Sequence, residues 1–531
     1  MPTWKELRSE EKKITPSVCH QKDPIVGVKL DYFEALNITI FRTLELIDVL
    51  PATGSTLRIK IKDGVDGSGS HAIYQQSDNA NTNNMIMYMF CLLEIVDNQT
   101  NSIIFKEKQS NSPHAMRPIF ITMGKETISN LTNVKEAFSK RNSNAEFVVQ
   151  FKHYAYNIQI EAQMTLIDGK MRALLSGLGG AYCLLCFITS DVACGRHGTY
   201  SSYFNITRSA ENTMSVWNNL VDENNVIKKR KSDYSVRGGL TQEPIIEEDL
   251  NMVSPLHCLL CIFRLVLLLI YHLRSETFVW SESEKKLGDS YDRYCKDKAE
   301  AKEIVFSKTG IKMDMPDATG KGGTTNTGNI CERLLTDYQH ILVSLVPPRF
   351  QSDMVELLNR LWVIISIYTS KPKDDLEVNT TLYGELCVET YDLIINGFEN
   401  SDSKWINVSP TLHMLLAHSW EIIEMNKNQG LGDYSETGLE HNNKFLRFFR
   451  QILARKTSQE TNLQDCIERL WLKADPKVRH DGPIKMCSTC KKVNDHSTVS
   501  CYLKKKCSVK CKPTYQTCMT FYEFYISQLY Q

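Results

Sequence analysis

The chain contains two stretches in which apolar and polar residues alternate, and the first runs into a glycine-rich segment. LRIKIK (57–62) alternates strictly and leads into DGVDGSGS (63–70). Alternation with a period of two predicts a strand buried on one face, and the glycine-rich run predicts a turn after it. We therefore expect this strand to deliver Asp63 to the end of a sheet. We prefer Asp63 to Asp66 as the functional acid because a three-residue offset leaves Asp66 in the turn.

The second alternating stretch also ends in an acid. Asp168 follows, in the same register, a set of apolar or weakly polar residues that share one strand face: Tyr156, Ile158, Ile160, Ala162, Met164 and Leu166. The pattern predicts a strand ending at Asp168 and a helix beginning near Lys170. A carboxylate in register with buried positions is costly unless a cation stabilises it. Ordinary explanations stay open, since Asp63 fits an Asp-Gly turn and Asp168 fits a helix N-cap.

A helical pattern further along the chain places one acid beside two bases. In LGDYSETGLEHNNKFLRFFR (431–450), Lys444 and Arg447 lie within about 40° of Glu440 on a helix of 3.6 residues per turn. An acid flanked by cations on one stripe suits a metal ligand beside a polyanion. The same stripe also suits a solvated surface helix, so the pattern alone leaves both interpretations open.

Composition and charge exclude few classes of protein. The 531 residues support a sizeable core and several domains. The 62 basic and 62 acidic residues balance, which is unusual for a nucleic-acid-binding protein, although local patches matter more than the sum. The apolar run of residues 258–273 includes Arg264. It is too short and too charged to span a membrane, so we predict a buried helix and no membrane partner.

Cysteine and histidine residues form a candidate metal set. Cys183-x-x-Cys186 together with His413 and His418 has the composition of a tetrahedral zinc site, although 226 residues separate the two halves. The five-residue histidine spacing is awkward, because residues i and i+5 differ by about 140° on a regular helix. A local irregularity after the expected N-cap at Ser409 would align both rings. Without it, buried cysteines and core histidines of this kind are commonly inert packing.

The C-terminal region has a second concentration of cysteines. Six of the 17 cysteines fall after residue 486, and a zinc-knuckle-like spacing is formed by Cys487, Cys490, His496 and Cys501. A disulfide framework would need an oxidising compartment, and the polar segment MPTWKELRSEEKKI (1–14) has no signal-peptide character. We therefore predict zinc in this tail. The lysines that follow suit contacts with DNA phosphates: Lys504, Lys505 and Lys506.

Several short motifs resemble, in order, the catalytic subunit of the RAG recombinase (recombination-activating protein 1) and the related Transib and ProtoRAG transposases. They extend collinearly over about residues 57–475 and include KDGVDGSGS (62–70), MRPIFITMGKET (116–127), LIDGKMRALLSGLGGAYCLLC (166–186), SPTLHMLLAHSWEII (409–423) and the 431–450 helix. The resemblance implies an α/β, RNase H-like DDE nuclease core, split by a mostly helical zinc-binding insertion and followed by a Cys-rich zinc tail. The ProtoRAG branch has a comparable tail that binds terminal DNA.

The resemblance also implies a catalytic site. Asp63 matches the first catalytic acid, Asp168 the second and Glu440 the last, while Glu126 matches an additional nearby acid. Carboxylates of this kind hold two Mg²⁺ or Mn²⁺ ions, which suit hard oxygen ligands. The family also has the Cys pair and the five-residue His spacing, so the resemblance implies structural Zn²⁺ at the Cys/His set. Lys444 and Arg447 would contact DNA.

These inferences give an expected organisation and two functional hypotheses. The expected parts are a leader (1–56), a first nuclease segment (57–178), a helical zinc-binding insertion (179–400), a second nuclease segment (401–478) and the basic tail (479–531). The first hypothesis is a nuclear transposase or recombinase that nicks double-stranded DNA at terminal repeats or recombination-signal-like sequences and forms hairpins by 3′-hydroxyl attack. It would act as a homodimer, with an accessory subunit like that of RAG. The alternative is a non-catalytic, zinc-stabilised DNA-binding or assembly protein derived from a truncated transposase.

Overall fold

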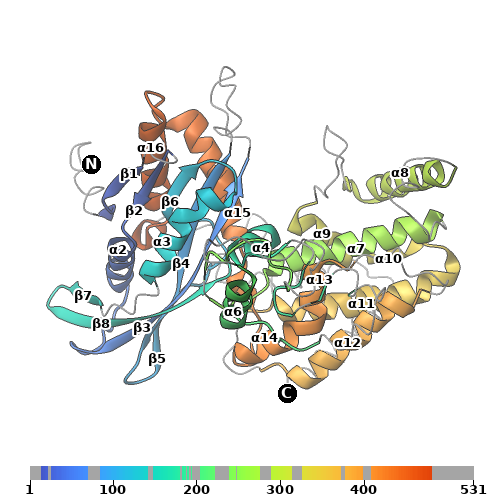
Figure 1. Cartoon of the computed structure of the whole chain (residues 1–531), viewed down its shortest axis with the longest axis horizontal. Coiled ribbons are helices and arrows are strands. Elements are labelled where there is room, and N and C mark those ends of the chain that lie inside the picture. The colour runs from blue at the N-terminus through green and yellow to red at the C-terminus, as the bar shows by residue number, and fades with distance from the viewer. Residues whose placement is uncertain are drawn as a thin grey trace. The chain divides into compact units, whose positions relative to one another are not determined.

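The described part of the chain forms two compact units (Figure 1). One unit joins the described residues up to 163 with residues 437–480, and we call it the sheet unit. The other comprises residues 164–436, and we call it the helical unit. The computed structural model describes residues 14–21, 26–69, 84–141, 147–179, 182–186, 188–189, 193, 204–221, 238–246, 248–250, 252–275, 289–313, 326–371, 377–398 and 408–480.

The sheet unit is built on one sheet whose strands do not follow their order in the sequence. Its described strands are β1 (Val18–Gln21), β2 (Gly27–Leu30), β3 (Thr56–Ser68), β4 (Met85–Asp97), β5 (Ser102–Lys106), β6 (Arg117–Met123), β7 (Phe147–Phe151) and β8 (Tyr154–Met164). They follow the order β1-β2-β6-β4-β3-β8-β7, and β5 pairs with β4. Nearly every residue of β4 and β6 is buried, so the centre of the sheet is covered on both faces. The sheet and its helices give the α/β class that the sequence predicts.

The helices of the sheet unit come from both ends of its sequence. They are α2 (Tyr32–Leu44), α3 (Thr132–Arg141), α15 (Thr437–Phe448), the π-helical turn η9 (Phe449–Leu453), α16 (Gln459–Lys473) and α17 (Pro476–His480). Asp31 caps α2 by accepting from the Phe33 and Glu34 amides at 3.0 Å. The segment expected to be a leader therefore supplies β1, β2 and α2 to the sheet unit. The expectation was wrong there because short strands flanked by polar residues carry little periodic signal.

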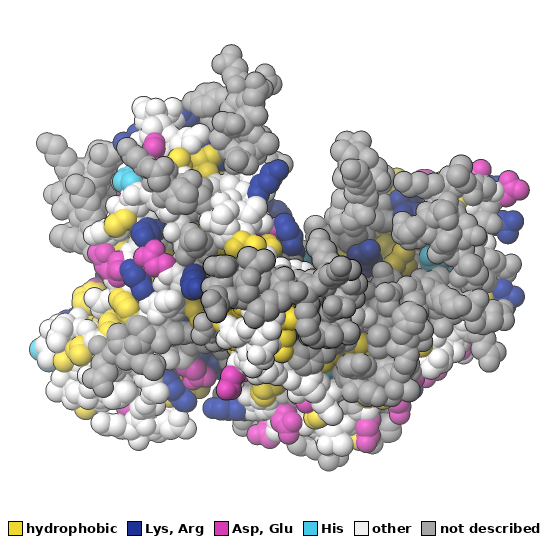
Figure 2. Space-filling view, viewed as in Figure 1, with side chains coloured by type: hydrophobic (Ala, Val, Ile, Leu, Met, Phe, Trp, Pro, Cys, Tyr) yellow, Lys and Arg dark blue, Asp and Glu magenta, His cyan; other side chains and the backbone are white. Residues whose placement is uncertain are grey.

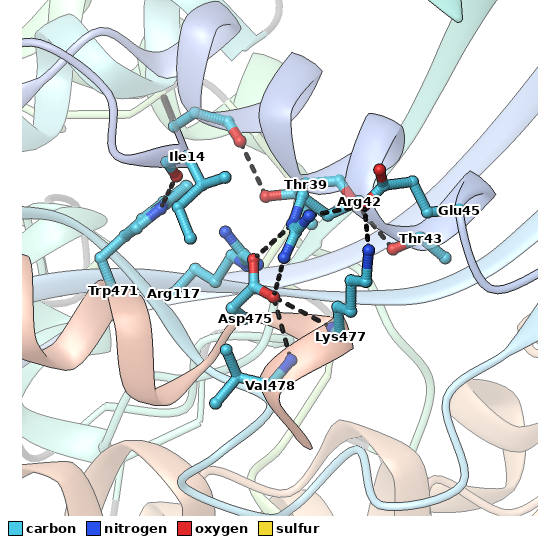
Figure 3. A network of polar contacts seen from close by, with 11 residues as sticks. Ile14, Thr39, Arg42, Thr43, Glu45, Arg117, Trp471, Asp475, Lys477 and Val478 are labelled. Carbon is cyan, nitrogen blue, oxygen red and sulfur yellow. Dashed lines mark hydrogen bonds and ion pairs between the residues drawn. The ribbon is translucent and has the colours of Figure 1, made fainter. Parts of the chain in front are cut away.

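A buried ionic network fastens the first helix of the sheet unit to the last (Figure 3). Asp475 is fully buried, and both of its oxygens accept from Arg42 of α2 at 3.0 Å. Arg117 of β6 approaches the same carboxylate at 3.4 Å and lies over the Trp471 ring, 4.3 Å from its centroid. The Trp471 indole N–H donates to the Ile14 carbonyl at 2.7 Å. Segments more than 400 residues apart in sequence thus close one fold.

The helical unit contains no named strand within the residues that the structure describes. Its elements include α4 (Gly169–Leu175), α6 (Ala210–Leu220), α7 (Pro255–Ser275), α8 (Asp289–Thr309), α9 (Gly328–Thr336), α10 (Gln339–Ser344), α11 (Gln351–Tyr368), α12 (Thr380–Asn396), α13 (Pro410–His413), the π-helical turn η7 (Met414–His418) and α14 (Ser419–Met425). Helix α7 contains the predicted apolar run and packs against α8, α9, α11 and α13. By length and composition alone it could cross a membrane, yet 56% of its apolar window is buried within the protein.

The unit boundaries differ from those expected. The helical unit begins at Met164 and ends at Glu436, so it takes residues from both expected nuclease segments. The tail predicted to bind zinc and DNA lies outside the described residues. This applies to Cys487, Cys490, His496, Cys501 and the lysines at 504–506.

Candidate metal centres

Strand β3 contains both acids that compete for the first catalytic position. It runs from Thr56 to Ser68, where Asp63 is opposite Phe90 and Asp66 is opposite Met87 of β4. The glycine-rich segment therefore continues the strand, and the reason for setting Asp66 aside does not hold. Side chains alternate between faces along a strand, so residues three apart point to opposite sides. The surroundings of the two acids show the same difference.

Asp63 is enclosed in the core. The Arg141 guanidinium donates to both of its oxygens at 2.8 and 2.9 Å, and the Tyr88 hydroxyl donates to Oδ2 at 2.7 Å. None of the Asp63 surface is exposed, and only 4% of Arg141 is. Burial alone would lower the pKa of Arg141, but the Asp63 carboxylate raises it. A metal ion would have to displace this buried cation, so the geometry favours a structural role for Asp63.

Asp66 lies on the other side of the strand, next to the helix that carries Glu440. The Asn443 side-chain amide in α15 donates to Asp66 Oδ2 at 2.8 Å. Asp66 and Glu440 are both half-buried. Glu440 lies one helical turn before Asn443, and side chains three apart on a helix are neighbours, with Cβ atoms about 5–6 Å apart. The contact therefore brings the Asp66 carboxylate to the part of α15 from which Glu440 projects.

Glu126 reaches the same end of β3. It follows β6 and lies against Gly67, where an added Cβ would be only 1.9 Å from the Glu126 Oε1 atom. Glycine is thus required at this position for the carboxylate to approach the strand backbone. Asp66, Glu126 and Glu440 all belong to the sheet unit: Asp66 lies in β3, Glu126 lies against Gly67 of β3, and Glu440 lies on the helix whose Asn443 contacts Asp66.

Asp168 belongs to the helical unit and caps a helix. Strand β8 ends at Met164, so Asp168 does not continue its register as predicted. Instead it is the N-cap of α4, which begins at Gly169, and its Oδ1 accepts from the Met171 amide at 2.6 Å. The capping alternative therefore describes its local structure. Capping uses one oxygen of the carboxylate and leaves Oδ2 outside that bond.

The two predicted DNA-contacting cations lie on α15. Lys444 is exposed, and the Arg447 guanidinium donates to the Gly69 carbonyl at 3.1 Å, just beyond the end of β3. Basic and acidic side chains are interspersed on the face shown in Figure 2, in keeping with the balanced composition. Any attraction for a polyanion at α15 would therefore be local and not a property of the whole face.

The structure brings together the four predicted Cys/His ligands in the helical unit. One ligand atom from each of Cys183, Cys186, His413 and His418 lies within 4.8 Å of the others, and all four side chains are buried. His413 ends α13, and the following residues to His418 form the π-helical turn η7. In a π-helix, hydrogen bonds join residues five apart, which places such residues one above the other. This turn supplies the irregularity that the five-residue spacing needs, and Ser409 caps α13 as predicted.

The geometry of this Cys/His group fits a tetrahedral ion. With metal–sulfur bonds near 2.3 Å and metal–nitrogen bonds near 2.0–2.1 Å, ligand atoms in a tetrahedron should be roughly 3.3–3.8 Å apart. Cys186 Sγ and His413 Nε2 are separated by 3.4 Å. Among the described residues, His418 Nε2 has no hydrogen-bond partner although it is buried. A bound ion would satisfy this nitrogen, which otherwise carries a desolvation penalty.

The electrostatics of the group favour a thiolate. Burial alone would raise the pKa of Cys183, but the neighbouring Cys186 thiol and His413 ring lower it well below its ordinary value. The Leu185 amide also donates to Cys183 Sγ at 3.4 Å. Thiolate sulfur and neutral imidazole are the donors that structural zinc prefers. The described group therefore has a composition, separation and charge state that suit Zn²⁺ better than Mg²⁺.

Comparison with known families places the sheet and its acids in a class. Residues 59–181 match the family model of an RNase H domain, which suggests a nuclease-type protein that uses divalent metal ions. That model describes the RNase H domain of recombination-activation protein 1 (RAG1), and the match supports a RAG1-like family. The matched range extends from β3 to beyond α4. It includes Asp63 and Asp66, the two candidates for the first acid, and also Glu126 and Asp168. No curated protein matches the chain.

Sequence reasoning missed two side chains that distinguish the acids of β3. Arg141 contacts the buried acid and Asn443 contacts the helix-facing acid. Arg141 lies outside the motifs, and Asn443 lies in the 431–450 motif, where only Glu440, Lys444 and Arg447 were predicted to be functional. The alternation of apolar and basic residues along β3 could have distinguished the buried acid from the helix-facing one. Asp63 shares its register with the apolar residues Leu57, Ile59 and Ile61, whereas Asp66 shares the register of the basic ones. An acid in the apolar register requires an internal cation.

Proposed function

We propose that the chain is a DDE-type DNA nuclease, of the transposase and recombinase class, whose sheet unit holds the reacting phosphodiester. The observation that carries the proposal is the contact between Asp66 of β3 and Asn443 of α15. It joins the strand that carries the first acid to the helix that carries the last one. Together with the RNase H family match, this arrangement supports a carboxylate site for divalent ions.

Within this proposal, Asp66 takes the role that the sequence motif suggested for Asp63. Asp63 is already paired with Arg141 in the core, whereas Asp66 faces α15. Glu440 is the last acid, and Glu126 supports the site beside Gly67. Asp168, in the helical unit, is kept as the second acid on the motif resemblance alone. These hard oxygen donors suit Mg²⁺ or Mn²⁺.

The residues around the acids have different proposed roles. When bound, two divalent ions would activate the attacking water or 3′-hydroxyl and stabilise the leaving oxygen. Asn443 orients the Asp66 carboxylate through its amide, leaving the second Asp66 oxygen outside that bond. Lys444 and Arg447, on the stripe of Glu440, suit contacts with the phosphates on either side of the reacting bond. The Arg447 bond to the Gly69 carbonyl fixes that side chain near the end of β3.

The Cys/His group serves a different purpose in this proposal. We infer a structural Zn²⁺ held by Cys183, Cys186, His413 and His418, because all four ligand positions of a tetrahedral ion are filled by protein atoms. A structural ion of this kind would fasten the cysteine segment to the helix that follows α13. It would not take part in DNA cleavage.

The finer identity rests on the motifs. Their order and the Cys/His set support a Transib- or ProtoRAG-like transposase that nicks DNA at terminal repeats and forms hairpins. A homodimer, an accessory subunit like that of RAG and a nuclear location complete this proposal. The alternative of a non-catalytic, zinc-stabilised DNA-binding protein makes a different prediction in the experiment below.

A nicking assay tests the proposal directly. The full chain is incubated with duplexes that carry candidate terminal repeats and Mg²⁺ or Mn²⁺, and Glu440→Gln is compared with wild type. We expect cleavage to fall by about a hundredfold or more, because the variant keeps its shape but loses a metal-binding charge. Glu161→Gln, on an exposed position of β8, is the matched control and should cleave normally. DNA binding without nicking by the wild-type chain would favour the alternative.

A further inference from the structure

A second layer of side chains surrounds the two histidines of the Cys/His group. A ligating imidazole uses one ring nitrogen for the metal, and a hydrogen bond to the other nitrogen decides which tautomer is present. His413 and His418 each have one partner at the outer nitrogen, and the two partners differ in chemistry. One is the neutral hydroxyl of Tyr391 and the other is the carboxylate of Glu421.

The partner of His413 is a tyrosine whose own proton is committed elsewhere. The Tyr391 hydroxyl in α12 donates to the Ala193 carbonyl at 2.8 Å and lies 3.1 Å from His413 Nδ1. A phenol has a single proton, so with that proton on Ala193 it can only accept from the ring. Nδ1 therefore carries the hydrogen, and the lone pair is on Nε2, the atom 3.4 Å from Cys186 Sγ. Tyr391 is fully buried.

The partner of His418 is an acid with one oxygen already fixed. Glu421 Oε2 accepts from the Ile206 amide at 2.9 Å and lies 3.6 Å from His418 Nδ1. This separation is longer than a hydrogen bond, but a carboxylate so close to a buried ring still favours a proton on the facing nitrogen. His418 Nε2 is then left with a lone pair and, among the described residues, with no hydrogen-bond partner.

We propose that Tyr391 and Glu421 are positioning residues: Tyr391 presents His413 to the metal through Nε2, and Glu421 does the same for His418. The inference rests on the structural metal site proposed above and extends it beyond the four ligands. Neither residue touches the metal position. Each acts on a ligand from outside, by fixing the tautomer and the orientation of a ring.

The same two residues also connect the halves of the ligand set. Ala193 and Ile206 both follow the cysteine pair in sequence, whereas Tyr391 and Glu421 belong to α12 and α14. Tyr391 is hydrogen-bonded both to His413 and to the cysteine-bearing segment, whereas Glu421 is hydrogen-bonded to that segment and faces His418 at 3.6 Å. Because 226 residues lie between the cysteine pair and the histidine pair, this second connection reduces the freedom of the two halves when the ion is absent.

The test measures how fast the intact, zinc-loaded chain releases its ion. Zinc release into an excess of a colorimetric chelator is followed for wild type, Tyr391→Phe and Glu421→Gln, and Cys183→Ser identifies the signal that belongs to this group. Tyr368→Phe is the matched control. It removes an equally buried tyrosine hydroxyl that donates to a backbone carbonyl, that of Val253 at 2.8 Å, away from the four ligands.

We expect Tyr391→Phe to release zinc about 10–100 times faster than wild type, with Tyr368→Phe unchanged. The chain loaded with Co²⁺ should also show shifted d–d absorption bands in Tyr391→Phe and not in Tyr368→Phe, because ring orientation alters the ligand field. Glu421→Gln should release zinc at least about threefold faster, and it carries the test if Tyr391→Phe does not fold.

Two results would overturn the inference, and they differ from failure of the metal site itself. Equal release from Tyr391→Phe and Tyr368→Phe, with unshifted Co²⁺ bands, would show that Tyr391 only packs. Unchanged release from Glu421→Gln would remove Glu421 from the proposal. A wild-type chain whose zinc content is the same as that of Cys183→Ser would instead refute the structural metal site on which the inference rests.

Discussion

The two candidate metal centres differ in how their ligands are arranged. In the helical unit, four buried ligand atoms of the Cys/His group lie within 4.8 Å of one another, and every ligand belongs to the same unit. In the sheet unit, Asp66, Glu126 and Glu440 are half-buried, and the bond from Asn443 to Asp66 connects the end of strand β3 to the helix that carries Glu440. A closed set of four protein ligands is typical of a structural ion, whereas an incomplete carboxylate set leaves positions for water and substrate.

The difference teaches that the two centres should respond to mutation in opposite ways. Ligands of a structural ion contribute directly to folding free energy, so their loss should appear as instability. Acids of a catalytic centre are held near one another against repulsion, so their loss should spare stability and remove activity. Asp63 is the informative exception, because it lies in the sheet unit but is bound like a structural residue.

The largest expected effect is loss of the Cys/His group. Cys183→Ser should lower the zinc content by one equivalent and destabilise the helical unit by roughly 5 kcal/mol or more, since the ion's binding energy contributes to folding. Metal analysis and thermal unfolding measure the two effects. Cys331→Ser is the control, a buried cysteine of α9 outside the ligand group, and it should retain the metal. An unchanged metal content in Cys183→Ser would make this group ordinary core packing.

The next largest effect separates the two acids of β3. Asp66→Asn should reduce cleavage by about a thousandfold with little loss of stability. Asp63→Asn should lower the free energy of unfolding by about 3–5 kcal/mol, because it leaves the buried Arg141 charge without its partner. Single-turnover nicking and urea unfolding of both variants give the comparison. Stable but inactive Asp63→Asn, with active Asp66→Asn, would reverse the assignment.

The β3 acids show how far sequence reasoning extends. Period-two alternation predicted β3 and β8, and the chain's motifs predicted the four Cys/His ligands that the structure brings together. The end of β3 was placed too early because glycine usually breaks a strand, but here pairing with β4 continues to Ser68 opposite Met85. Tertiary pairing of this kind outweighs local propensity, and local sequence does not encode it.

Other features depend on contacts between distant segments. The Asp475 network joins α2 to the end of α16 across 433 residues, and no local pattern marks Arg42 or Arg117 as its partners. The π-helical turn at 414–418 has an ordinary apolar sequence, so only the histidine spacing hinted at it. Partners of buried charges and rare helical turns are therefore the parts that the sequence alone left undetermined.

A third prediction tests the ionic network of the sheet unit against pH. Burial alone would raise the pKa of Asp475, but Arg42 and Arg117 lower it below its ordinary value. A lowered folded-state pKa gives stability that is present above pH about 4 and is lost as the pH falls through the folded-state value. Asp475→Asn should therefore cost about 3 kcal/mol near pH 7, and its difference from wild type should shrink in acid.

The control for that prediction is an acid on α16, the helix that precedes Asp475. Asp465 pairs with Arg455, whose side chain is 61% exposed, so Asp465→Asn should cost only about 0.2–1 kcal/mol. Urea unfolding at pH 7 and at pH 3 measures both variants. A pH-independent difference between Asp475→Asn and wild type would show that the lowered pKa does not contribute to stability.

The smallest expected effect concerns Gly67, which distinguishes a supporting acid from a structural one. An alanine there would meet the Glu126 carboxylate, but that group is the end of a flexible side chain and can move aside. Gly67→Ala should therefore change the free energy of unfolding by less than about 1 kcal/mol, because the backbone need not shift. Cleavage should fall by about tenfold if the displaced Glu126 supports the acid site.

Adding Glu126→Gln to Gly67→Ala should then cause no further loss of cleavage, since both changes act on one carboxylate. Additive losses in the double variant would mean that Gly67 affects the site by another route, and that Glu126 does not act from its position against β3.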